Sequence, residues 1–144
     1  MISFIQRLHV SRICREGLFS IKSDVFSFGV LVLEIVSSRR NKGFVHHGHN
    51  LNLLGHAWNL FKEGRELEIV DSCIVNSYHS SEVLRSIQVA LLCVQQSPED
   101  RPDMSSVVFM LGNDLLMPEA KQPSFFMERN IVNGEMSITT LEGR

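Results

Sequence analysis

Cysteine pairs are missing from this 144-residue sequence. Its three cysteines, Cys14, Cys73 and Cys93, form no CxxC motif, and any disulfide scheme would leave one of them unpaired. This usage is typical of a reducing compartment and excludes a disulfide scaffold. Cys93 lies in the apolar run 89–94, which predicts a small buried thiol rather than a nucleophile.

The sequence also lacks a concentrated positive charge and a long apolar run. The net charge is −2 with a pI near 6.3, and the only basic cluster is 39–42, so we expect no nucleic-acid partner. No apolar stretch approaches the roughly 20 residues of a membrane span, and residues 1–7 have no signal-peptide pattern. We therefore expect this chain to be cytoplasmic and to make no membrane contact itself.

Metal-binding spacing is absent as well. Four histidines, His46, His47, His49 and His56, lie close together, but their spacing matches no usual zinc pattern and no thiolate or carboxylate completes a set. The prediction is solvated histidines in a loop over 37–50 and no metal site.

The residues that are present predict an all-α fold. With 44% hydrophobic and 21% charged residues, the chain has the material for one folded domain. Apolar residues surround the stretch from Asp24 to Ser37, which favours a helix buried on all sides and capped by Ser23 or Asp24, over a buried strand at 30–36. Three further helices are predicted at 51–62, ending at Gly64, at 81–95, and from an Asp103 cap to Gly112. In the last of these, Met104, Val107, Val108 and Leu111 lie at i, i+3, i+4 and i+7, the spacing of one helix face.

The last 32 residues change character. Pro118 and Pro123 interrupt regular structure, and Asn133-Gly134 is typical of a turn. We expect a mostly irregular tail over 113–144, in which Phe125 and Phe126 dock on the domain.

Two motifs identify the helices. The run Ser23-Asp24-Val25-Phe26-Ser27-Phe28-Gly29-Val30-Leu31-Val32-Leu33-Glu34 is followed some seventy residues later by Asp100-Arg101-Pro102, with Ala-Leu-Leu-Cys-Val-Gln just before it. Together they resemble the lower, helical lobe of a protein kinase. The segment 50–58 and the ending 121–130 resemble, more narrowly, the plant S-domain (G-type lectin, S-locus-like) receptor-like serine/threonine kinases.

The resemblance implies structural roles for three residues. In kinases, the aspartate at the position of Asp24 begins the central helix of the lower lobe and forms a hydrogen bond with the backbone of the catalytic loop. The glycine at the position of Gly29 lets a neighbouring stretch of backbone approach this helix closely. Arg101 matches the arginine that pairs with the glutamate of an Ala-Pro-Glu motif. Counting back from Arg15 places that glutamate at Arg12, so the implied ion pair is absent.

The motifs that perform catalysis in kinases do not occur in the sequence. There is no Gly-rich phosphate loop, no ATP-binding lysine motif, and no His-Arg-Asp, Asp-Phe-Gly or Ala-Pro-Glu. We therefore expect no catalytic, cofactor or metal residues and no binding of ATP and Mg²⁺, which the parent family uses to phosphorylate protein Ser/Thr at the plasma membrane. The alternative is a non-catalytic module that binds a kinase partner through exposed helical faces.

Three segments follow from the resemblance. Residues 15–112 are expected to form a partial kinase lower lobe, and 113–144 the family's tail, reaching its C-terminus. Residues 1–14 depart from the family. When the codons that the family usually has at this position are read two bases out of phase, they can encode the observed Leu8-His9-Val10-Ser11-Arg12-Ile13-Cys14. This match predicts that residues 1–14 are an out-of-frame leader, caused either by a lesion in the gene or by a misassembled gene sequence.

Overall fold

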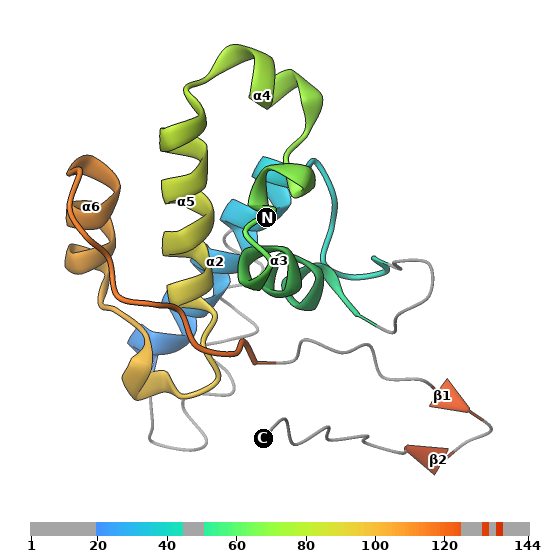
Figure 1. Cartoon of the computed structure of the whole chain (residues 1–144). Coiled ribbons are helices and arrows are strands. Elements are labelled where there is room, and N and C mark those ends of the chain that lie inside the picture. The colour runs from blue at the N-terminus through green and yellow to red at the C-terminus, as the bar shows by residue number, and fades with distance from the viewer. Residues whose placement is uncertain (1–19, 45–50, 125–130, 133–134, 137–144) are drawn as a thin grey trace.

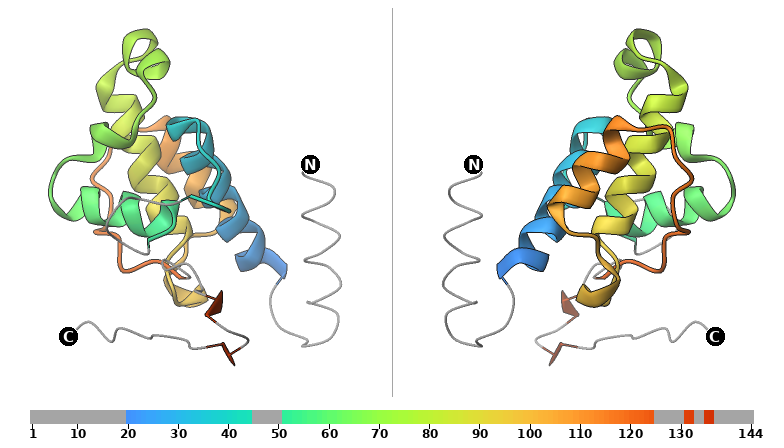
Figure 2. Two further views of the ribbon diagram at one scale, coloured as in Figure 1. Left: turned by 90° about the vertical axis from the view of Figure 1, so that its right-hand side faces the viewer. Right: turned by 90° about the vertical axis from the view of Figure 1, so that its left-hand side faces the viewer.

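The chain folds around two long helices. A computed structural model describes residues 20–44, 51–124, 131–132 and 135–136. The elements are α2 (Ser20–Ser37), α3 (Leu53–Lys62), η1 (Glu66–Ile69), α4 (Ser72–Ser77), α5 (Ser80–Cys93), η2 (Pro98–Asp100), α6 (Met104–Gly112), β1 (Ile131–Val132) and β2 (Glu135–Met136). Helix α5 packs along α2, while α3 and α6 lie on opposite sides of α5 (Figures 1 and 2). The predicted all-α class is confirmed.

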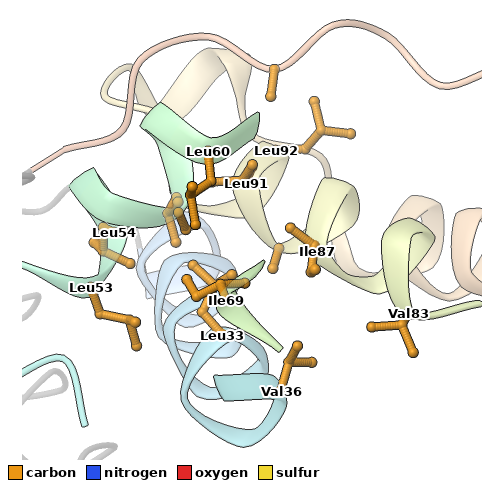
Figure 3. Close-up of a cluster of buried hydrophobic side chains, with 14 of the residues drawn as sticks. Leu33, Val36, Leu53, Leu54, Leu60, Ile69, Val83, Ile87, Leu91 and Leu92 are labelled. Atoms are coloured by element: carbon orange, nitrogen blue, oxygen red, sulfur yellow. The ribbon is translucent and has the colours of Figure 1, made fainter. Parts of the chain in front are cut away.

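The core lies between α2, α3 and α5. Leu33 and Val36 of α2 meet Leu53 and Leu54 of α3 and the inner face of α5 (Figure 3). The fully buried members include Leu33, Leu53, Leu54, Ile87 and Leu91. Each such side chain contributes about 1.5–3 kcal/mol relative to leaving it in water.

Helix α2 begins four residues before the predicted start. It runs from Ser20, so neither Ser23 nor Asp24 is its N-cap. Its burial is also less complete than predicted: Val25 and Leu33 are buried, but the side chain of Ile35 is 60% exposed. Helix α2 therefore carries more apolar side chains than the described neighbouring elements cover.

Helix α3 ends as the sequence predicts. The side chain of Asn52 caps its start by accepting a hydrogen bond from the Gly55 N–H at 3.1 Å. Gly64 follows the last turn with φ of +69°, a left-handed conformation that favours glycine.

Three short helical elements were not predicted: η1, α4 and η2. Asp71 caps α4 through the Cys73 N–H at 2.8 Å, and α5 follows directly. Helix α5 buries Ile87 and Leu91 in the core. It covers 80–93 rather than the predicted 81–95.

Helix α6 has the predicted cap, but little of its apolar stripe is buried. Asp103 accepts a hydrogen bond from the Ser106 N–H at 2.8 Å, and this bond is the main reason that the pKa of Asp103 falls to about 2. Of the predicted stripe only Val107 is buried, while Met104, Val108 and Leu111 are exposed. The predicted helix is confirmed, but most of its apolar stripe stays exposed among the described residues.

The first part of the tail docks on the domain rather than standing free. From α6 the chain crosses α5 (Figure 1), and Gln122 O accepts a hydrogen bond from the Gln96 N–H at 3.0 Å. The buried amide of Gln95 accepts from the Lys121 N–H at 2.7 Å, and Ala120 and Pro123 are buried. Irregular backbone therefore contributes to the core up to Ser124.

Further along, the tail contains a short strand pair. Strands β1 and β2 are antiparallel, with Ile131 opposite Met136 and Val132 opposite Glu135. The predicted turn at 133–134 and the predicted docking of Phe125 and Phe126 fall on residues outside the described part. Among the described residues, no helix combines the length and apolar composition that a bilayer crossing requires.

Candidate functional site

Gly29 is the point of closest approach between α2 and α5. A Cβ built on Gly29 would lie 2.7 Å from the Ala90 carbonyl oxygen, 2.7 Å from Cys93 Cβ and 2.8 Å from Val94 Cγ1. Real Cβ atoms do not approach other heavy atoms this closely. The two helices can therefore pack at this distance only because residue 29 is glycine.

Asp24 is not at the start of the helix, where the sequence places it. It lies inside α2, one turn beyond the helix start, and its side chain is exposed. Within the described residues, no backbone N–H is bonded to its carboxylate. In this chain Asp24 therefore neither caps the helix nor holds a loop of the described part.

Arg101 is buried against the start of α2. Its Nε donates to Gln95 O at 2.7 Å, Nη1 to Lys22 O at 3.2 Å and Nη2 to Gln96 O at 3.3 Å. The Lys22 ammonium in turn donates to Arg101 O. These reciprocal bonds join the N-terminal end of α2 to the chain that follows α5.

The charge of Arg101 has an aromatic neighbour. Its Cζ lies 4.9 Å from the centroid of the Phe26 ring, within cation–π range. Burial lowers the pKa of Arg101 from its ordinary value. None of the carboxylates in the described residues pairs with the guanidinium, and Arg12, at the position of the implied partner, lies outside them.

Cys93 is a buried structural thiol, as the sequence predicts. Its side chain lies in a small cluster with Val25, Val89 and Val107. Burial raises the pKa of Cys93 to about 12, although the nearby Arg101 charge opposes this shift. The thiol is therefore protonated at neutral pH and unsuited to nucleophilic attack. Cys73 is exposed, and Cys14 lies outside the described residues.

The described residues show no metal centre. They hold no group of three or more His, Cys, Asp or Glu side chains that could share an ion. His56 stacks on Phe44 with ring centroids 5.5 Å apart, so it is a packing residue rather than a solvated loop histidine. His46, His47 and His49 lie outside the described part.

Among the described residues, the arrangement around α2 and α5 is a support structure of packing contacts and hydrogen bonds to backbone carbonyls. Gly29 contacts α5, and Arg101 contacts the residues that follow α5. Asp24 makes neither of these contacts. Sequence reasoning missed Lys22, Phe26, Gln95 and Gln96, which hold Arg101. Backbone carbonyls provide three of its partners, and carbonyls carry no residue-specific signal in a sequence.

Comparison with known proteins matches this support structure to one family. The profile described as protein tyrosine and serine/threonine kinase matches residues 11–111. The G-type lectin S-receptor-like serine/threonine-protein kinase SD1-1 of Arabidopsis thaliana is 51% identical over 140 residues, covering 90% of this chain and 17% of the relative. The G-type lectin S-receptor-like serine/threonine-protein kinase SRK of the same plant is 57% identical over 122 residues, covering 80% and 14%.

A solved structure supports the same fold. The pseudokinase domain of BIR2, described as an immune regulator of the RLK/Pelle family, superimposes with a TM-score of 0.58 at 28% identity. The match covers 69% of this chain and 30% of that domain. The chain thus spans less than a fifth of the two curated relatives and under a third of the structural neighbour.

Proposed function

We propose, from the premise that this chain belongs to the protein tyrosine and serine/threonine kinase family, that it is the helical part of a receptor-like kinase domain without phosphotransfer activity of its own. The fragment is similar to the G-type lectin S-receptor-like kinases over most of its length. The absence of activity is the step that goes beyond this family assignment.

One observation carries the proposal. Phosphoryl transfer depends almost entirely on positioned groups: a loop and a lysine on the phosphates, carboxylates on Mg²⁺, and an aspartate on the attacking hydroxyl. None of the motifs that supply these groups occurs in the 144 residues. In the described part of the chain, Gly29 and Arg101 contact other parts of the helical scaffold.

In a longer protein the same residues would serve an active enzyme. There they would support a site that transfers the γ-phosphate of ATP, with Mg²⁺, to protein Ser/Thr hydroxyls on the cytosolic side of the plasma membrane. We place the present chain by itself in the cytoplasm. In the longer protein, these helices would form the surface on which the catalytic segments rest.

A second function, a non-catalytic module that binds a kinase partner, is favoured by exposed apolar helical surface. Ile35 on α2 and Val108 on α6 are both more than half exposed. The BIR2 domain, named a pseudokinase and an immune regulator, is similar to this chain. This function requires a discrete complex with fixed stoichiometry when the chain is mixed with the kinase domain of an SD1-1-like relative. Polydisperse aggregates would count against it.

Nucleotide binding tests the proposal at equilibrium. The purified full chain is melted with and without Mg-ATP, beside the complete kinase domain of a G-type lectin relative. A ligand at 100 times its Kd would stabilise a binding protein by about 2.7 kcal/mol. We expect the relative's melting temperature to rise and that of this chain to stay unchanged. A rise in both that requires Mg²⁺ would refute the proposal.

A further inference from the structure

An open apolar groove runs along α6. Its walls come from the segment after η2, from α6, and from the extended chain that follows α6. Its volume of about 610 Å³ is large enough for several side chains. The apolar lining includes Pro102, Phe109, Met110, Leu115, Leu116 and Pro118.

Several of the apolar side chains that line the groove are exposed. Phe109 is 55% exposed, Leu115 is 53% exposed, and Leu116 is fully exposed. Of the eleven large apolar side chains that are exposed in the described part, six lie between Met104 and Leu116. Contiguous apolar surface of this kind is normally covered by another segment or partner.

One carboxylate, that of Asp100, lines the groove, and further acidic residues neighbour the lining residues in the sequence. Five carboxylates lie between residues 99 and 121: Glu99, Asp100, Asp103, Asp114 and Glu119. Asp114 pairs with Arg85, and Asp100 pairs with Lys121 at 2.8 Å. Arg101 is buried, so Lys121 is the exposed basic residue of this stretch. An occupant that fits would carry apolar side chains and positive charge.

The start of α2 lies beside one end of this groove. Lys22 and Arg101 exchange hydrogen bonds through their main-chain carbonyls, and Arg101 is followed by the groove residue Pro102. Four residues, 16–19, separate Arg15 from Ser20. Such a connection reaches at most about 14 Å when extended.

The residues that precede this connection have matching chemistry. Residues 1–15 contain three arginines, Arg7, Arg12 and Arg15, and no Asp or Glu. Seven of the fifteen are large apolar residues: Met1, Ile2, Phe4, Ile5, Leu8, Val10 and Ile13. This segment therefore combines positive charge with apolar side chains and is joined to the end of α2 beside the groove.

We propose that residues 1–15 dock in the α6 groove of the same chain, with apolar side chains on Phe109, Leu115 and Leu116 and Arg7 toward Asp100 on the groove wall. The short tether favours this contact over one between chains, because it gives the segment a high effective concentration at the groove. The inference concerns only the surface of α6 and does not depend on whether the chain is catalytic.

Hydrogen exchange of the full chain, read by mass spectrometry, tests the docking. We expect the amides of residues 2–15 to exchange about tenfold more slowly than in a synthetic peptide of residues 1–15, because a docked segment must open before it exchanges. Phe109→Ser should bring the rate within about twofold of the free peptide. Val108→Ser is the matched control, since Val108 is the neighbouring residue on α6, is 66% exposed, and does not line the groove.

Leu116→Ser is the second variant. Leu116 lies outside α6 and is fully exposed, so its change should open the segment even if Phe109→Ser alters the helix. Exchange in the unmodified chain as fast as in the peptide would overturn the proposal. So would equal effects of Phe109→Ser, Leu116→Ser and Val108→Ser. Protection that disappears on dilution would also overturn it, because the groove would then be occupied by a second copy.

Discussion

Gly29→Ala is expected to destabilise the fold although alanine is the better helix former. A new methyl group would meet the Ala90 carbonyl oxygen at 2.7 Å, and that oxygen already accepts the Val94 N–H at 3.2 Å. The oxygen is part of the α5 backbone and cannot rotate away. The two longest helices must therefore separate locally.

The magnitude follows from two opposing effects. Replacing a helical glycine by alanine stabilises by up to about 1 kcal/mol. Overpacking a close contact costs about 1–3 kcal/mol and occasionally more. Because three separate atoms lie within 3.0 Å of the new Cβ, we take the upper part of that range. The net loss is about 1–2 kcal/mol, which lowers the urea midpoint by about 0.5–1 M.

Urea denaturation followed by circular dichroism measures this loss. Gly112→Ala is the matched control, because a Cβ there meets nothing within 4 Å and the residue also lies in a helix. We expect the control to be neutral or slightly more stable than the unmodified chain. If Gly29→Ala behaves like Gly112→Ala, the close contact between α2 and α5 is not present in solution.

Three other predictions concern charge and protonation. The depressed pKa of Asp103, about 2, means that its capping contribution is complete above the ordinary Asp pKa of about 3.9 and is lost as the pH falls through 2. Asp103→Asn should therefore reduce the loss of stability between these pH values in acid unfolding curves, and an unchanged curve would contradict the cap. With a pKa of about 12, Cys93 should resist iodoacetamide at pH 8 in the folded chain while exposed Cys73 reacts, as read by mass spectrometry; equal labelling would contradict its burial. Arg12→Glu should raise the free energy of unfolding when Arg101 is present and not in an Arg101→Ala background, a coupling of about 0.5–3 kcal/mol in a double-mutant cycle; equal gains in both backgrounds would show that the two positions do not meet.

Local signals in the sequence were sufficient for the main helices. The Asp103 cap, the glycine at 64 and the apolar runs predict α2, α3, α5 and α6 to within a few residues. These features depend on neighbouring residues, so no long-range information is needed. The start of α2 was predicted too late because Ser23 and Asp24 resemble a cap, whereas the helix continues back to Ser20.

Long-range features could not be predicted in this way. The stripe on α6 has helical periodicity, but periodicity does not say whether a partner covers it, and Val108 and Leu111 are exposed. The docking of the tail depends on Gln95, which bonds the main chain of Lys121 and Asp100, and backbone partners leave no pattern in the sequence. For Arg101 the resemblance implied a carboxylate partner, whereas the described structure provides carbonyls and Phe26.

Phosphotransfer by the purified full chain tests the central claim most directly. The chain is incubated with Mg²⁺, ATP labelled at its γ-phosphate, and a general Ser/Thr protein substrate, beside the kinase domain of a G-type lectin relative. The account predicts label on the substrate with the relative and none above background, on substrate or chain, with the present protein. Label transferred by the purified chain in a Mg²⁺-dependent manner, growing linearly with its concentration, would contradict it.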